Sequence, residues 1–144
     1  MIIALGSDHA GFSLKNFLSA WLLEQGHQIH DVGTFTADRV DYPEYGAELG
    51  RVVAEGQADY GIGVCGSGQG ICMAANKVHG IRGAVIRTAE DAALSRAHND
   101  ANIACLGERA TEPDVAKEVI GVFLSTPFEG GRHAARVEQL NNLI

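Results

Sequence analysis

The sequence predicts one α/β domain with a doubly wound, mostly parallel five-stranded sheet of Rossmann-like type and helices on both faces. Short apolar runs alternate with amphipathic segments along the chain, and parallel neighbouring strands need crossover connections of this kind. The length of 144 residues suits one compact domain and is too short for two ordinary ones. We therefore expect a single domain over residues 1–144.

Two strand-helix pairs are expected in the first half of the chain. Residues 2–5 form an apolar run that Gly6 ends, which predicts a buried strand. Residues 12–24 carry leucines and aromatic residues at helical spacing and stop before a glycine. A second strand is expected at residues 27–32, and a second helix at 45–55, where apolar side chains again fall on one side.

The second half repeats this alternation. Residues 60–65 read as a buried strand, residues 66–70 as a glycine-rich turn and residues 71–78 as a helix. Residues 81–86 and 103–106 are expected to form the last two strands. Residues 89–97, 115–124 and 134–143 are expected to form helices, and the C-terminal helical region spans about 131–143.

Composition and charge exclude several classes of protein. The formal net charge of -7 opposes a general attraction to nucleic acid or to an anionic membrane surface. No apolar run approaches the ~20 residues of a membrane span, and no basic region precedes the apolar start, so we expect neither a signal peptide nor a membrane span. Cys65, Cys72 and Cys105 lack the spacing of a zinc site or a disulfide framework. We expect a cytoplasmic protein with reduced thiols.

The glycine-rich segment at residues 66–70 is a candidate anion site. It follows an apolar strand and opens a helix, which points several backbone N–H groups and the positive helix end into one space. It matches neither a dinucleotide fingerprint nor a phosphate-binding NTPase loop, because the glycine spacing differs and no lysine precedes a serine or threonine. A tight turn without a ligand is the alternative.

Cys65 is the last residue of the strand before this loop. Its sulfur adjoins N–H groups that favour the thiolate, the form that can act as a base. The alternative is a buried cysteine that packs as a small apolar side chain, and this interpretation is favoured for Cys72 and Cys105. In open α/β sheets ligands bind beyond the carboxyl ends of the strands, where the Asp8-His9 pair and the loop after Leu106, with Arg109, are also expected.

Two further groups of polar residues carry weaker signals. His98 and Asn99 follow a predicted helix, and no histidine or carboxylate has the spacing of a metal site, so we expect no metal. Arg132 and Arg136 are four residues apart in a predicted helix, so both guanidinium groups can reach one phosphate. An ordinary solvated helix face is the alternative for this pair.

Taken together, six segments in their order and spacing resemble ribose-5-phosphate isomerase of type B over the whole chain. They are residues 6–11 (GSDHAG), 41–43 (DYP), 65–70 (CGSGQG), 75–77 (ANK), 95–102 (SRAHNDAN) and 130–133 (GGRH). The wider family also contains isomerases of galactose 6-phosphate and related sugar phosphates. The resemblance implies an aldose-ketose isomerase of the pentose phosphate pathway that interconverts ribose 5-phosphate and ribulose 5-phosphate without a cofactor.

The resemblance also implies roles for individual residues. Cys65 would be the base that moves a proton between C1 and C2 through an enediolate, Ser67 would help to stabilise the oxyanion, and His98 would assist ring opening. One branch of the family has a serine and a glutamate for this step; here the glutamate position is Ala74, which supports the cysteine mechanism. Substrate-binding residues would be Asp8, His9, Tyr42, Gly66, Gly68, Gln69, Gly70 and Asn99, and phosphate-binding residues Arg109, Arg132 and Arg136.

The family's assembly is a homodimer or a dimer of dimers with shared active sites. The resemblance suggests that His98, Asn99 and Arg109 complete a site whose Cys65 belongs to the partner subunit. Alternatives for the function are an isomerase of a tetrose, allose or galactose phosphate, a nucleotide-binding module without chemistry, and a cysteine hydrolase.

Overall fold

The structure, a computed structural model, describes residues 1–143. These residues contain a five-stranded sheet in the order β2-β1-β3-β5-β4, with every pair parallel. The predicted α/β class is confirmed, and the sheet is entirely parallel. The strands are β1 (Ile2–Ser7), β2 (Gln28–Asp31), β3 (Tyr60–Cys65), β4 (Gly83–Val85) and β5 (Ile103–Gly107).

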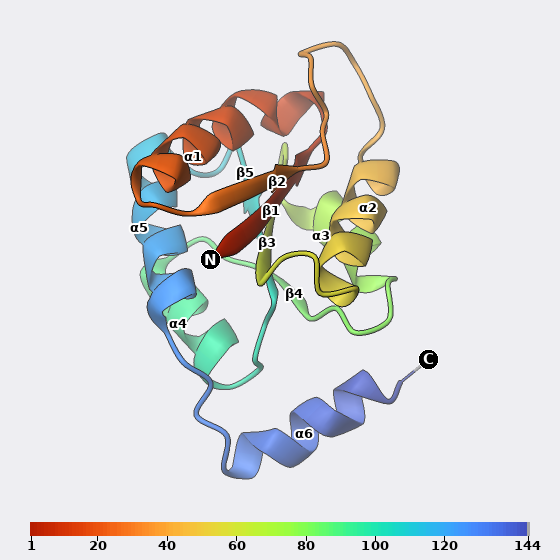
Figure 1. Cartoon of the computed structure of the whole chain (residues 1–144), viewed down its shortest axis with the longest axis vertical. Coiled ribbons are helices and arrows are strands. Elements are labelled where there is room, and N and C mark those ends of the chain that lie inside the picture. The colour runs from red at the N-terminus through yellow and green to blue at the C-terminus, as the bar shows by residue number, and fades with distance from the viewer. Residues whose placement is uncertain (144) are drawn as a thin grey trace.

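Helices cover both faces of the sheet, as predicted. In Figure 1, α1, α4 and α5 lie on one side, α2 and α3 lie on the other, and α6 stands apart below the body. No helix in residues 1–143 is both long and apolar enough to cross a bilayer. The helical segments are η1 (His9–Gly11), α1 (Phe12–Glu24), α2 (Tyr42–Ala54), α3 (Gln69–Asn76), α4 (Ala89–Ala97), α5 (Pro113–Ser125) and α6 (Arg132–Asn141).

Each face of the sheet has its own apolar core. Leu18, Leu22 and Phe123 are fully buried on the face that α1 and α5 cover, and Leu49 of α2 is fully buried on the other face. Burying one such side chain stabilises the fold by roughly 1.5–3 kcal/mol. The apolar spacing seen in the sequence therefore selects which helix surface meets the sheet.

Four helices, α2, α3, α5 and α6, begin two or three residues earlier than their apolar pattern indicates, and the starts of α2 and α3 affect the site. α2 begins at Tyr42 because Pro43 lies in its first turn, where a missing N–H is tolerated. α3 begins at Gln69, directly after Gly68 in a left-handed conformation (φ 81°), so Gly70 is helical and not part of the predicted turn. Both shifts move predicted site residues from loops onto rigid helices.

The sheet has two functionally distinct edges. β1, β3 and β5 end together at the carboxyl edge, at Ser7, Cys65 and Gly107. α4 returns the chain to the amino end of β5, so the turn that follows it lies at the opposite, amino edge. Asp100 in that turn lines a hollow together with Met1 and Tyr60, which lie at the amino ends of β1 and β3.

Candidate active site

A cavity of about 360 Å³ lies at the carboxyl edge of the sheet. It is formed by the ends of β1 and β3, the start of α2 and the loop after β5, as expected for a parallel sheet. Its lining residues are Asp8, His9, Ala10, Tyr42, Cys65, Gly66, Ser67, Gly70 and Arg109.

The glycine loop presents its backbone to Cys65. The Gly68 N–H donates to Cys65 Sγ at 3.2 Å, and the Gln69 N–H donates to Ser67 Oγ at 3.3 Å. Cys65 is only 4% exposed, yet its residue lines the cavity. Gly68 and Gln69, which were predicted to bind substrate, do not line this cavity. Gly68 contacts the Cys65 sulfur instead.

Two glycines allow larger side chains to approach the loop. A Cβ on Gly66 would lie 2.8 Å from Arg109 Nη1, and a Cβ on Gly70 would lie 2.6 Å from the Tyr42 ring. Distances this short exclude any larger residue without movement of the neighbour. The glycines therefore admit a guanidinium and an aromatic ring to the cavity wall.

Asp8 and His9 are held by hydrogen bonds to the backbone. Asp8 Oδ1 accepts the Gly11 N–H at 3.1 Å. His9 Nδ1 lies 3.2 Å from the Val40 nitrogen and 3.1 Å from the Val40 oxygen, so it is occupied by that backbone in either tautomer. Nε2 is therefore the ring nitrogen of His9 that is left for a ligand.

The loop after β5 joins the same site. The Arg109 N–H donates to the Gly66 oxygen at 3.1 Å, and the Glu108 N–H donates to the Cys65 oxygen at 2.9 Å. The Glu108 carboxylate also accepts the Leu14 N–H at 2.6 Å, which places a negative charge at the amino end of α1. These bonds attach Arg109 to the Cys65 loop of its own chain.

His98 and Asn99 line a second cavity, of about 270 Å³. His133 and Arg136 of α6 contribute to it, and the His98 and His133 rings stack with centroids 4.3 Å apart at 14°. Glu129 Oε2 lies 3.9 Å from His98 Nε2 and 3.7 Å from His133 Nε2. Burial, followed by the charges of His98 and Arg132, lowers the pKa of His133.

The predicted site is thus divided between two places on one chain. The five-residue β5 separates the amino edge from the carboxyl edge by about 16 Å at ~3.3 Å a residue. The grouping of Arg109 with His98 and Asn99 that the resemblance suggested is wrong, because the loop after β5 emerges at the carboxyl edge beside Cys65, where the strand rule had placed it. Arg132 and Arg136 lie on α6, which shares the second cavity with His98, and both arginines are exposed.

Comparison with known proteins shows the family of this chain. The sequence model described as Ribose/Galactose Isomerase matches residues 3–140. The chain belongs to this family. It is 44% identical over 138 residues to ribose-5-phosphate isomerase B of Escherichia coli (strain K12), which covers 96% of this chain and 93% of that protein.

Solved structures of the family superpose closely on this chain. Ribose-5-phosphate isomerase B of Clostridium thermocellum has a TM-score of 0.97 at 45% identity, over 98% of this chain and 95% of that one. The Mycoplasma genitalium ribose-5-phosphate isomerase B with bound ribulose-5-phosphate has a TM-score of 0.93 at 36% identity, over 97% of this chain and 93% of that one. The family resemblance drawn from the motifs is confirmed.

His98, Glu129 and His133 are also possible metal ligands, because their ligand atoms lie within 4.8 Å of one another. The two rings are nearly parallel, so their nitrogen lone pairs do not converge on one point as metal coordination requires. The positive charges of Arg132 and Arg136 beside His133 also disfavour a cation. The geometry fits a carboxylate that orients two imidazoles better than it fits a metal centre.

His133 and Glu129 are not among the predicted site residues. The only sequence signal for them is the segment at residues 130–133, which contains His133 beside Arg132. Their proximity to His98 depends on how the chain turns between α5 and α6, and no periodic pattern encodes that turn.

The other two cysteines, Cys72 and Cys105, are buried next to each other. Burial, together with the neighbouring Cys72 thiol, raises the pKa of Cys105 well above its ordinary value. Cys72 is also buried, in α3. These positions fit the predicted packing role of both residues.

Proposed function

We propose that this chain is a ribose-5-phosphate isomerase in which Cys65 is the catalytic base. The observation that carries the proposal is the placement of the Cys65 sulfur beside a glycine loop, a histidine and an arginine in one cavity. This cavity combines a base, hydrogen-bond donors and a positive charge. Similarity to ribose-5-phosphate isomerase B over nearly the whole chain supports the same reaction.

Cys65 removes the proton from C2 of the open-chain aldose. The C–H electron pair forms the C1–C2 double bond, and the negative charge moves to the C1 oxygen. Returning the proton to C1, while the C2 hydroxyl proton passes to the C1 oxygen, gives ribulose 5-phosphate. Backbone N–H groups of the glycine loop, with Ser67, stabilise the charged oxygen, the step to which fixed donors contribute most.

The other residues hold the substrate. Asp8 and Tyr42 contact hydroxyl groups, and His9 presents Nε2 because Val40 occupies Nδ1. Arg109 supplies positive charge beside Gly66. The reaction needs no cofactor, since the proton shuttle and the donors are groups of the protein.

A second copy of the chain completes each site. His98, which assists ring opening, and Asn99, which orients the substrate oxygens, follow α4 at the amino edge. The length of β5, about 16 Å, separates this edge from the carboxyl edge that carries the Cys65 of their own chain. Arg132 and Arg136 are on the same side as His98 and bind the phosphate. In a two-fold dimer, or a dimer of such dimers, the amino edge of one chain meets the carboxyl edge of its partner. We place the enzyme in the cytoplasm, where its three free thiols stay reduced.

The test is the Cys65→Ala variant assayed on a panel of phosphorylated four-, five- and six-carbon sugars. Removing the base is expected to lower kcat by about 10²- to 10⁴-fold, the usual contribution of general acid-base catalysis. Binding of ribose 5-phosphate, measured by calorimetry, is expected to persist. The matched control is Cys72→Ala, which removes a buried thiol of the same chain and is expected to remain active.

Two results would contradict the proposal. A Cys65→Ala enzyme with a large fraction of the original turnover would remove the thiol from the mechanism. A wild-type protein that binds nucleotides and isomerises none of the sugars would favour the binding module. The sugar with the highest kcat/KM identifies the substrate, and a preference for a four- or six-carbon sugar would correct the ribose assignment.

A further inference from the structure

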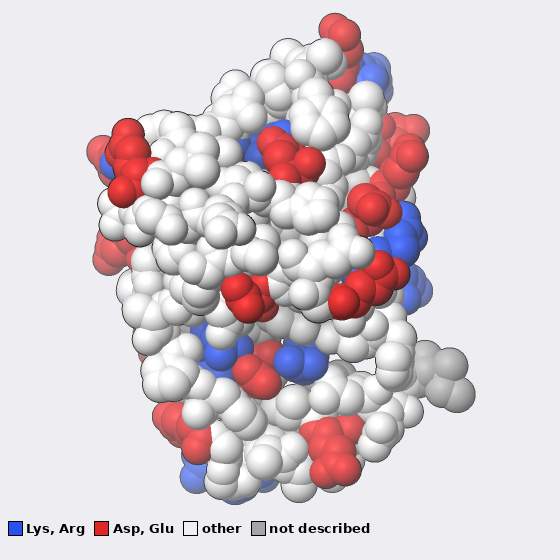
Figure 2. Space-filling model, in the orientation of Figure 1, with Lys and Arg blue, Asp and Glu red and all other residues white. Residues whose placement is uncertain are grey.

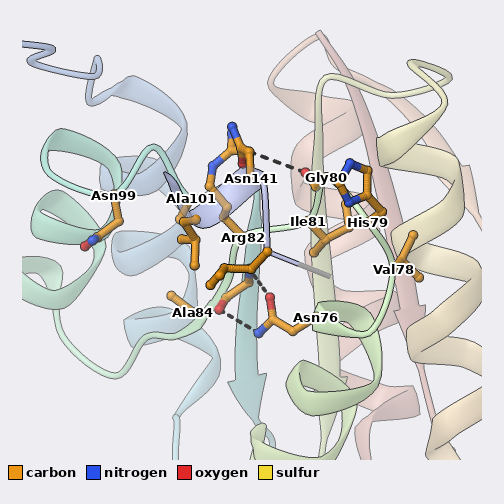
Figure 3. A pocket seen from close by; sticks show the side chains of 13 residues that line it. Asn76, Val78, His79, Gly80, Ile81, Arg82, Ala84, Asn99, Ala101 and Asn141 are labelled. Atoms are coloured by element: carbon orange, nitrogen blue, oxygen red, sulfur yellow. Dashed lines mark hydrogen bonds between the residues drawn. The ribbon is translucent and has the colours of Figure 1, made fainter. Parts of the chain in front are cut away.

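Arg82 precedes β4 and connects this part of the chain to the turn after α4 and to the end of α6. The Arg82 Nε donates to the backbone oxygen of Asp100 at 2.8 Å, and its Nη1 donates to Asn141 Oδ1 at 2.9 Å. Nη2 lies 3.4 Å from Asp100 Oδ2, and the Arg82 side chain is only 14% exposed. The guanidinium thus links the turn after α4 with the last turn of α6. Figure 3 shows Arg82 and Asn141 together at the cavity beside Gly80.

The turn after α4 is held in an unusual conformation. Asp100 has φ +48°, a left-handed geometry that is uncommon outside glycine, although aspartate adopts it more readily than most residues. Arg96, 4% exposed, donates from Nη1 to Asp100 Oδ1 at 2.7 Å and to the Ala101 oxygen at 2.8 Å. Arg82 and Arg96 therefore fix this turn from two sides, directly after His98 and Asn99.

Asn102 ties Arg82 itself to the same turn. The Arg82 N–H donates to Asn102 Oδ1 at 2.8 Å, and Asn102 Nδ2 donates to the Gly80 oxygen at 2.9 Å. Figure 2 shows basic and acidic side chains together in the hollow between the body and the lower part of the molecule, where Figure 1 places α6. The basic groups of this network are thus already paired within the chain and are not free to bind a phosphate.

α6 has little other attachment to the body. Of its residues, only His133 and Val137 are buried, and a cavity of about 570 Å³ lies between the end of α6 and the connection that precedes β4. The helix is held at its start by the stack of His133 on His98, and near its end by the hydrogen bond that Arg82 donates to Asn141. Both attachments lead to the turn that carries His98, Asn99 and Asp100.

We propose that Arg82 is a positioning residue that holds the His98–Asn99 turn and α6 as one rigid unit. It thereby sets the separation between His98, which assists ring opening, and the α6 arginines that bind the phosphate, and hence the length of sugar phosphate that fits. The inference rests on the proposed function, because it assigns Arg82 a role in that reaction. Arg82 acts through Asp100 and Asn141 and does not touch the substrate.

The test compares Asn141→Leu with Asn142→Leu. Asn142 is the adjacent exposed residue, and within residues 1–143 its side chain makes no hydrogen bond, so it is a matched control. Loss of the Arg82–Asn141 bond is expected to raise KM for ribose 5-phosphate by about tenfold with kcat changed much less, since misplacement by ~1 Å has effects up to 10²-fold. Hydrogen exchange of the α6 amides is expected to accelerate in Asn141→Leu and not in Asn142→Leu.

Variants of Arg82 extend the comparison. Arg82→Met loses both links and is expected to lower kcat/KM by about 10²-fold, whereas Arg82→Lys keeps a charge beside Asp100 and is expected to recover kcat more than KM. Adding Asn141→Leu to Arg82→Met is expected to raise KM no further, because the shared bond is already lost. All constants are measured per folded subunit, at concentrations where sedimentation shows an unchanged assembly.

Two outcomes would overturn the inference. One is an Asn141→Leu enzyme with the KM and the α6 exchange of Asn142→Leu. The other is an Arg82→Met enzyme that yields less folded protein but keeps kcat and KM. A wild-type protein inactive on every sugar phosphate would instead overturn the proposed function, so the two failures are distinguishable.

Discussion

Mixing inactive variants tests whether each site is shared between two subunits. Cys65 and Arg109 lie at the carboxyl edge, and His98 lies at the amino edge of the same chain. If the edges of two partners meet, a Cys65→Ala chain and a His98→Ala chain together form one doubly damaged site and one intact site. Each variant alone contains no intact site.

The expected activity follows from random pairing. Equal amounts of the two chains make about half of the dimers mixed, and one site in two is then intact, so about a quarter of the wild-type sites return. The structure adds a control that should not complement. Because Arg109 is bonded to the Cys65 loop of its own chain, Cys65→Ala mixed with Arg109→Ala is expected to show no activity beyond that of the variants refolded separately.

The assay unfolds the purified variants together, refolds them, and measures isomerisation of ribose 5-phosphate per subunit. Mass spectrometry of the intact assembly verifies that mixed dimers have formed. Verified mixed dimers of Cys65→Ala and His98→Ala without recovered activity would refute the shared site. Recovery in the Cys65→Ala and Arg109→Ala mixture would instead show that Arg109 serves the partner's Cys65.

Three further predictions concern stability, pH and metal ions. Lys15 is fully buried and donates to Asp31 at 2.7 Å. Breaking a buried ion pair costs about 3–5 kcal/mol, and because the Asp31 side chain is 27% exposed we expect Lys15→Met to lower the free energy of unfolding in urea by an amount near the lower end of that range. An unchanged denaturation midpoint would contradict this. Burial lowers the pKa of His133, so the folded chain binds fewer protons at this residue than the unfolded chain, and the neutral ring stabilises the fold above the ordinary pKa of 6.5 but not as the pH falls below it. The fall in Tm from pH 7.5 to pH 5.5 is therefore expected to be smaller in His133→Asn than in the wild type. An equal fall in both proteins would oppose this reasoning. Exhaustive chelation of metal ions is expected to leave kcat/KM within about twofold of the untreated enzyme, because backbone donors stabilise the enediolate. A loss of activity that a divalent cation restores would disprove this prediction.

Local patterns were sufficient to predict most of the fold. Residues 12–24, 60–65 and 89–97 have the bounds predicted from apolar spacing and glycine stops. The predicted strand at 81–86 is shorter, at Gly83–Val85, because the Arg82 N–H is bonded to the Asn102 side chain instead of to a neighbouring strand. Such side-chain contacts over long sequence separation leave no periodic signal.

The sequence by itself determined the α/β class, the motifs of the family and the gathering of Asp8, His9, Cys65 and Ser67 in one cavity. These follow from local periodicity and from the rule that parallel strands end at a common edge. The strand rule also predicted Arg109 at the edge that carries Cys65. Only the tertiary structure decided that His98 lies at the opposite edge, where it stacks on His133 and shares a cavity with Arg136. The physical reason is chain direction: a crossover helix returns the chain to the amino edge, so residues after a helix and residues after a strand lie on opposite sides of the sheet.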